Sequence, residues 1–149
     1  RPLDLFSHEQ MRRSWYSFLF QLPVAEAIAS VDDLELVDRL WADWSPGFDG
    51  AEDIRRAKDC LRAPGRLAAA IEYYRQSPSA LRHGAPPQIE RPLLYLHGEG
   101  DGCIGVDVVR AARESFPPGA RIEILDGVGH FLHLERPAEV NRLILEFLG

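Results

Sequence analysis

Two strand patterns near the C-terminus, each followed by a helical pattern, constrain the fold of this chain most. The segment PLLYLHG at 92–98 is a continuous apolar run, as expected of a parallel strand that is covered on both faces. The segment ARIEILDG at 120–127 alternates isoleucines with Arg121 and Glu123, as expected of a half-exposed edge strand. Strand, helix, strand and helix in this order predict a βαβα segment of a parallel sheet, and therefore an α/β fold.

A pair of parallel strands needs more protein around it than this segment supplies. Both faces of a parallel sheet have to be covered, and two strands alone are marginally stable. The chain of 149 residues begins with RPLDLF, and its one methionine is Met11. We therefore expect the rest of the sheet to come from residues outside this sequence.

The residues before the strands have helical periodicity. The segments with this pattern are SHEQMRRSWYSFLFQLP, DDLELVDRLW, AEDIRRAKDCL and GRLAAAIEYYRQ. Four prolines then occur within 77–92, which predicts little regular structure there. These patterns predict a helical region at 1–76, a linker at 77–91 and a sheet-forming segment at 92–149.

Charge and cysteine content exclude several classes of partner. The formal net charge is −6, and the 17 basic residues are spread along the chain, so we expect no nucleic acid and no anionic membrane as a partner. No segment approaches the roughly 20 consecutive apolar residues that cross a bilayer. The two cysteines, Cys60 and Cys103, do not make a disulfide framework in a chain of this size, which predicts a cytoplasmic protein.

Two polar residues follow the ends of the predicted strands. Asp101 comes after the first strand and His130 after the second. Because the carboxyl ends of parallel strands meet at one edge of a sheet, we expect these side chains to lie close together. The carboxylate can then accept the Nδ1 proton of His130 and leave Nε2 as a base. The sequence therefore predicts a hydrogen bond between Asp101 and His130.

Other residues compete with this pair. Glu99 lies at the same strand end as the predicted acid, and Asp126 lies in the loop of His130, where a turn residue is expected. His97, His130 and His133 are three histidines that could serve as metal ligands. His97 falls inside a strand, however, and no third ligand at short spacing accompanies the other two, so no metal site is predicted.

Four segments resemble α/β-hydrolases. LLYLHGEGDGCI and LDGVGHFLHLERPAEV resemble the acid and histidine segments of this superfamily, in which nucleophile, acid and histidine follow one another along the chain. WYSFLFQLP and EYYRQ resemble the two cap tyrosine segments of epoxide hydrolases. The resemblance covers essentially the whole chain, and it implies an α/β-hydrolase fold fragment in which a helical cap precedes the C-terminal part of the core.

The resemblance implies a role for each matching residue. Asp101 corresponds to the acid of the triad, His130 to the general base, and Tyr16 and Tyr74 to the cap tyrosines. In epoxide hydrolases an aspartate opens the epoxide and forms an ester, and the tyrosines hold and protonate the epoxide oxygen. The histidine and its acid then activate the water that hydrolyses the ester. The expected substrate is a small apolar epoxide, and neither a cofactor nor a metal is expected, because hydroxyl donors meet the charge on the oxygen.

Each tyrosine has a simpler interpretation as well. Tyr74 lies on the apolar face of its predicted helix, where a packed tyrosine with a locally bonded hydroxyl is the alternative, and its neighbour Tyr73 is the alternative residue for the role. Tyr16 lies beside an apolar stripe, so that its side chain could face a cleft while its neighbours face the core.

The chain departs from the family at the nucleophile. Neither Gly-x-Ser-x-Gly nor Gly-x-Asp-x-Gly occurs in the 149 residues. We therefore expect activity to need an N-terminal half of the fold, from the same gene or a separate chain, and expect this chain alone to be inactive. The alternatives are a haloalkane dehalogenase or an ester hydrolase on the same fold, or a non-catalytic truncated fragment that dimerises through unpaired strand edges.

Overall fold

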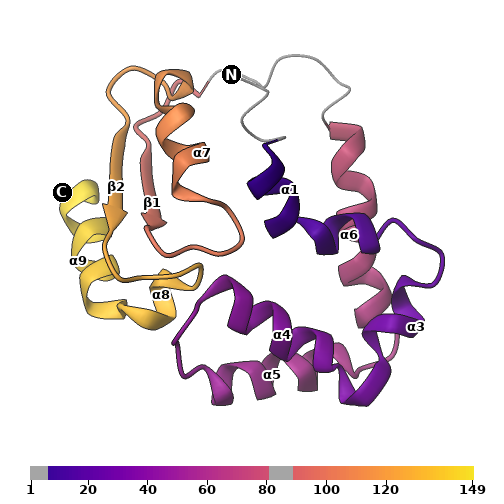
Figure 1. Ribbon diagram of the computed structural model, residues 1–149. Helices are drawn as coiled ribbons and strands as arrows, with labels where there is room; N and C mark the ends of the chain where they lie inside the picture. The colour runs from indigo at the N-terminus through magenta and orange to yellow at the C-terminus, as the bar shows by residue number, and fades with distance from the viewer. Residues whose placement is uncertain (1–6, 81–88) are drawn as a thin grey trace. The chain divides into compact units, whose positions relative to one another are not determined.

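The computed structural model describes residues 7–80 and 89–149, and the chain divides into two compact units (Figure 1). The first consists of Arg1–Arg13, Asp43–Phe48 and Pro87–Gly149, and we call it the sheet unit. The second consists of Ser14–Ala42 and Asp49–Pro86, and we call it the helical unit.

The two predicted strands form a parallel pair in the sheet unit. β1 (Leu94–Gly98) pairs with β2 (Arg121–Leu125), with the first residues of the two strands opposite each other and the last residues likewise. The two arrows point the same way in Figure 1, so the loops that follow the strands leave from the same end of the sheet. The predicted parallel α/β arrangement is confirmed.

Helices follow both strands. α7 (Val106–Ala111) comes after β1, and α8 (Leu132–Glu135) and α9 (Pro137–Leu148) come after β2. α9 begins at its proline because the first turn of a helix does not need the N–H that proline lacks. The short helix α1 (His8–Arg13) also belongs to this unit.

The core of the sheet unit lies between the strands and the last two helices. Its buried members come from β2, the loop after it and α9, and residues of β1 and α8 pack against them. They are Leu125, Val128, Val140 and Leu143, with Leu96 and Leu132 partly buried at the edge. Because this core includes the last residue of β2 and Val128 of the loop after it, it holds that loop in place.

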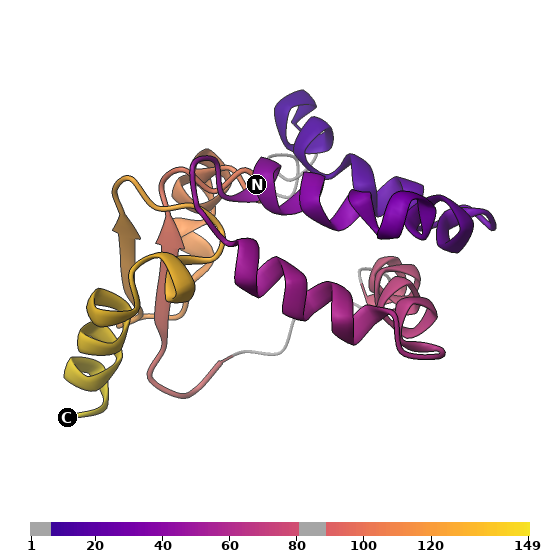
Figure 2. The same ribbon diagram turned by 90° about the horizontal axis from the view of Figure 1, so that it is seen from below.

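The helical unit contains a series of short and medium-length helices. α4 and α5 lie side by side in both views (Figures 1 and 2), and Lys58 Nζ lies 2.7 Å from Asp38 Oδ2 between them. The successive helices are α2 (Trp15–Leu19), α3 (Ala25–Ala29), α4 (Glu35–Trp44), α5 (Ala51–Leu61) and α6 (Arg66–Ala80).

Helix α6 corrects the predicted start of the linker. The helix continues to Ala80, so the first residues of the segment predicted to be irregular from 77 onward are helical instead. Pro78 has no N–H to donate to the carbonyl of Tyr74 four residues earlier. The side-chain amide of Gln21 donates to that carbonyl at 3.0 Å and replaces the lost bond. Residues 81–88 of the predicted linker lie outside the described residues, and the three-part division of the chain stays a prediction.

None of the helices in the described part of the chain is both long and apolar enough to cross a membrane.

Candidate active site

The carboxylate of Asp101 is buried in the loop that follows β1. The residue is 4% exposed, and its backbone N–H donates to Gly98 O at 3.1 Å. Oδ1 accepts the backbone N–H groups of Cys103 at 2.7 Å and Ile104 at 2.9 Å. The loop therefore curls around its own acid and leaves Oδ2 for another partner.

That partner is the imidazole of His130. Nδ1 lies 2.9 Å from Asp101 Oδ2, so the predicted contact between the two strand-end loops is confirmed. Because an ionised carboxylate can only accept, Nδ1 carries the proton and donates it. Nε2 of the neutral ring is then the nitrogen that can take up a proton.

The surroundings of Asp101 keep it charged. Burial acts to raise the pKa of this carboxyl group. The hydrogen bond from His130 and the backbone N–H groups of Ile104 and Cys103 act in the opposite direction and prevail, so the pKa lies below its usual value. A charged carboxylate can stabilise the imidazolium that forms when His130 accepts a proton.

A second histidine lies next to the same carboxylate. His97 of β1 is 3% exposed, and its Nδ1 is 3.9 Å from Asp101 Oδ2. Its Nε2 lies 3.1 Å from the carbonyl of Ile104, which can only accept, so Nε2 carries a proton. Burial lowers the pKa of His97 and outweighs the opposite effect of the nearby negative charge. We call residues 99–105, after β1, the acid loop, and residues 126–131, after β2, the histidine loop. The neutral ring of His97 links β1 to Ile104 of the acid loop, and the hydrogen bond to Asp101 Oδ2 comes from His130.

Both strand-end loops bond to one backbone carbonyl from the first half of the sequence. Trp44 O accepts the N–H of Gly102 at 3.0 Å and the N–H of His130 at 3.1 Å. The centroid of the Trp44 side-chain ring lies 5.2 Å from that of the imidazole. The end of α4 therefore sets the distance between the acid loop and the histidine loop.

The next residue holds the histidine loop from the other side. Ser45 Oγ donates to Glu135 Oε1 at 2.8 Å and accepts the N–H of Phe131 at 3.1 Å. Glu135 Oε2 accepts the N–H of Gly129 at 2.8 Å. The backbone on both sides of His130 is thus fixed by one buried serine and one glutamate.

Helix α1 fixes the acid loop. Gln10, which is 5% exposed, donates from Nε2 to Cys103 O at 2.9 Å and accepts the N–H of Gly105 on Oε1 at 3.0 Å. Arg13 Nη1 donates to Asp101 O at 2.7 Å. Sequence reasoning missed these two residues and the Trp44–Ser45 pair, because polar residues on a helix face and a Trp-Ser-Pro-Gly turn give no signal of a distant loop.

The two predicted tyrosines lie together in the helical unit. The ring of Tyr16 on α2 meets the ring of Tyr74 on α6 edge to face, with 5.6 Å between centroids and 88° between planes. Phe20 packs against both rings, with centroid distances of 5.9 and 5.0 Å. Tyr16 is 6% exposed and Tyr74 is half-buried, whereas the alternative residue Tyr73 is 72% exposed. Their proposed roles in the reaction stay predictions.

The competing acids have other positions. Glu99 is exposed and its Oε1 lies 2.7 Å from Arg110 Nη2, and Asp126 is exposed in the turn after β2. Within the described ranges, Asp101, Cys103 and His130 form a cluster with ligand-type atoms within 4.8 Å of one another. Three hydrogen bonds join the Asp101 carboxylate to His130 and to the backbone of Cys103 and Ile104.

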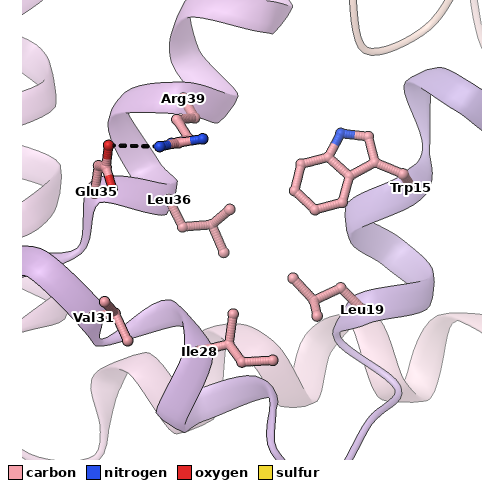
Figure 3. A pocket seen from close by; sticks show the side chains of 7 residues that line it. All are labelled: Trp15, Leu19, Ile28, Val31, Glu35, Leu36 and Arg39. Atoms are coloured by element: carbon pink, nitrogen blue, oxygen red, sulfur yellow. Dashed lines mark hydrogen bonds and ion pairs between the residues drawn. The ribbon is translucent and has the colours of Figure 1, made fainter.

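A pocket of about 310 Å³ is lined by residues of α2, α3, the turn after α3 and α4 (Figure 3). Trp15 and Leu19 of α2 point across it toward aliphatic side chains of α3, the following turn and α4. At its edge, Arg39 Nη2 donates to Glu35 Oε1 at 2.8 Å. The aliphatic members are Ile28, Val31 and Leu36. The helix that carries Tyr16 therefore also borders an apolar depression.

Comparisons with known proteins agree with this architecture. Residues 3–143 match the family described as the alpha/beta hydrolase family. The chain is 32% identical over 145 residues to the AB hydrolase superfamily protein YfhM of Bacillus subtilis, and it covers 49% of that protein. It is 32% identical over 146 residues to Epoxide hydrolase 3 of Mus musculus and 28% identical over 148 residues to Epoxide hydrolase 4 of Homo sapiens. Each alignment takes in 93% of this chain, and the two epoxide hydrolases are covered over 39% and 40% of their lengths.

The fold is also found in solved structures. An epoxide hydrolase variant from Bacillus megaterium, in complex with its product, superposes with a TM-score of 0.72 at 20% identity, over 97% of this chain and 55% of that one. The chain thus spans about half the length of the relatives that it matches, or somewhat less. It belongs to the alpha/beta hydrolase family and, within that family, is similar to epoxide hydrolases.

Proposed function

We propose that this chain is the C-terminal portion of an epoxide hydrolase that converts an epoxide to a diol through a covalent ester. The observation that carries the proposal is the edge-to-face pair of Tyr16 and Tyr74, because two neighbouring phenols suit an epoxide oxygen. The buried Asp101–His130 pair supports the second half of the reaction. The nucleophile comes from an N-terminal half of the fold, in the same or another polypeptide.

The first step is the opening of the epoxide ring. A carboxylate of the N-terminal half attacks a ring carbon, a C–O bond of the epoxide breaks, and an ester forms. The oxygen that leaves the carbon gains negative charge, and a hydroxyl of Tyr16 or Tyr74 donates a proton to it. Removing a single well-placed donor from such a site costs about a hundredfold or more in rate.

The second step is hydrolysis of the ester. His130 Nε2 takes a proton from water, and the hydroxide so formed adds to the ester carbonyl. The ester C–O bond breaks, and the imidazolium protonates the departing alkoxide so that the diol leaves. The carboxylic acid so formed gives up its proton, which returns to the tyrosinate left by the first step, and carboxylate and tyrosine are both restored. Asp101 stabilises the imidazolium throughout, since its carboxylate is held in the charged form.

The proposed substrate is small and apolar. Aromatic side chains surround the tyrosine pair, and the neighbouring pocket on α2 has apolar walls apart from one ion pair. The Bacillus megaterium relative was crystallised with a naphthyloxy-propanediol as its product. An aryl glycidyl ether, which such a diol derives from, is therefore the first substrate to test. A cytoplasmic location is part of the proposal, since a chain with two cysteines and no expected disulfide suits a reducing compartment.

The experiment measures ester formation and diol release separately, with the chain assembled with its N-terminal half. His130→Gln should trap the ester, which denaturing mass spectrometry detects as the protein plus one epoxide. Tyr16→Phe and Tyr74→Phe should slow formation of that ester by about a hundredfold each. A serine adduct would instead indicate an ester hydrolase, and halide release with unchanged turnover in both Phe variants would indicate a dehalogenase. No adduct under any condition would support the non-catalytic fragment.

A further inference from the structure

Two side chains link α6 and the segment just after α2 in opposite directions, next to the tyrosine pair. Arg75 of α6 donates from Nε to Phe20 O and from Nη2 to Leu22 O, both at 3.1 Å. Gln21, which lies between those two carbonyls in sequence, donates from Nε2 to Tyr74 O at 3.0 Å. Each segment thus supplies the donor for backbone carbonyls of the other.

The carbonyl of Tyr74 accepts from Gln21 because its usual donor is missing. In an α-helix the carbonyl of residue 74 bonds to the N–H of residue 78. Pro78 has no N–H, and the helix nevertheless continues to Ala80. The amide of Gln21 therefore occupies a position that proline has opened, from a point far away in the sequence.

The carbonyls that Arg75 binds lie just after the end of α2. That helix ends at Leu19, and carbonyls at the end of a helix lack donors within it. Arg75 is also 3.6 Å from a carboxylate oxygen of Glu26 and 3.7 Å from one of Glu72. A forked guanidinium with acids on two sides keeps a narrow set of orientations, which a lysine at this position would not reproduce.

These bonds lie within one residue or one turn of both tyrosines. Tyr74 precedes Arg75, and Tyr16 lies one helical turn before Phe20. The ring of Phe20 packs against the ring of Tyr74 at 5.0 Å between centroids. A change in the separation of the two backbones would therefore move one phenol relative to the other.

We propose that Gln21 and Arg75 are positioning residues that fix the spacing of the two phenols for one epoxide oxygen. The proposal rests on the proposed function, since it assigns these side chains a role in ring opening only. It also explains the position of Pro78: the proline gives no N–H to the carbonyl of Tyr74, and Gln21, from the segment after α2, donates to that carbonyl instead.

The test combines Gln21→Ala and Pro78→Ala in the chain assembled with its N-terminal half. Gln21→Ala removes the side-chain bond to Tyr74 O and with it one link between the two segments, and it should slow ester formation by about tenfold to a hundredfold. Pro78→Ala restores a backbone N–H aimed at the same carbonyl and alone should change little. The double variant should stay as slow as Gln21→Ala, because a backbone N–H within α6 satisfies the carbonyl of Tyr74 without linking it to the segment that carries Gln21. The control is Gln76→Ala, which removes an exposed glutamine whose side chain bonds to Glu72 of the same helix.

Two further readouts separate positioning from folding. Hydrolysis of the preformed ester should keep its rate in Gln21→Ala and in Arg75→Lys, whereas a general loss of structure would slow both steps. Ester formation at the wild-type rate in both variants, with Tyr16→Phe and Tyr74→Phe impaired, would overturn the positioning role and leave the proposed function standing. Normal ester formation in the two Phe variants would overturn both. Recovery of the rate in the double variant would show that the carbonyl of Tyr74 needs a donor of any origin, and it would contradict the positioning role of Gln21.

Discussion

At the scale of single residues, two imidazoles face one carboxylate oxygen. His130 Nδ1 is 2.9 Å and His97 Nδ1 is 3.9 Å from Asp101 Oδ2. The proton on His97 Nε2 is engaged by Ile104 O, so a neutral His97 has no second proton to offer the acid. The hydrogen bond to Asp101 is therefore left to His130 as long as His97 stays neutral.

The stability of the chain should depend on pH through His97. Its pKa in the folded state lies below the usual 6.5, because burial disfavours the charged ring. As the pH falls below 6.5, His97 therefore takes up a proton more readily in the unfolded chain than in the folded one. This difference lowers the free energy of unfolding by at most about 1.4 kcal/mol per pH unit. His97→Gln should reduce the loss of unfolding free energy between about pH 7 and pH 5, measured by urea titration.

The range of pH separates the effect of His97 from that of the neighbouring carboxylate. Asp101 contributes in another range: its pKa is below 3.8, so its stabilisation is present above that value and is lost at more acid pH. An unchanged slope between about pH 7 and pH 5 in His97→Gln would refute the role given to His97.

Gly98 should be intolerant of any side chain. A Cβ at this position would overlap the carbonyl oxygens of Gly129 and Val128, which are backbone atoms with little room to move. Gly98→Ala should lower the unfolding free energy by about 1–3 kcal/mol, as overpacking does in other proteins. Gly105→Ala is the control, because its nearest neighbours would be 3.6 Å away and the change should stay within about 0.5 kcal/mol. Equal effects in a thermal or urea unfolding experiment would contradict this argument.

At the scale of elements, the strands and the meeting of their loops were predictable from sequence. A continuous apolar run and an alternating one, each followed by a helix, leave few arrangements other than a parallel pair. The parallel pair then brings Asp101 and His130 to one edge. The bonds to Trp44 O were not predictable, because every residue has a carbonyl and the side-chain pattern says nothing about which one a distant loop will bind.

The end of α6 was not predictable from the sequence either. Local rules for proline predict that regular structure stops near Pro78, and a single sequence gives no sign of a compensating donor elsewhere. Gln21 provides that donor from the preceding helical segment. A long-range contact thus overrides a local preference at a position where proline removes a backbone hydrogen bond.

Ser45 should matter to ester hydrolysis through the histidine loop. Ser45→Ala removes the hydrogen bond from the N–H of Phe131 to Ser45 Oγ and the one from Ser45 Oγ to Glu135, and the serine is 1% exposed. We expect a loss of about 1–3 kcal/mol in unfolding free energy and slower release of diol, with ester formation little affected. The same change at the exposed Ser30, which bonds only within its own turn, should alter neither quantity. Equal rates of diol release in Ser45→Ala and wild type would contradict the link.

At the scale of the whole molecule, apolar surface and sheet edges remain for a partner to cover. Leu145 and Leu148 on α9 are 68% and 74% exposed, although Val140 and Leu143 on the same helix are buried in the core. The described sheet has two strands, so each strand keeps one edge unpaired. In the proposed function the N-terminal half of the fold covers these surfaces.

We expect the oligomeric state of the chain to depend on whether the N-terminal half of the fold is present. Alone, the chain should form dimers or larger species, because exposed leucines and unpaired strand edges associate with like surfaces. With the N-terminal half present, it should form a one-to-one complex instead. Light scattering coupled to gel filtration gives both masses. The double variant Leu145→Glu with Leu148→Glu should weaken the complex, whereas the exposed Arg142→Glu on the same helix should not weaken it to that extent. A chain that stays monomeric alone and ignores the N-terminal half would show that α9 has another partner than the proposed one.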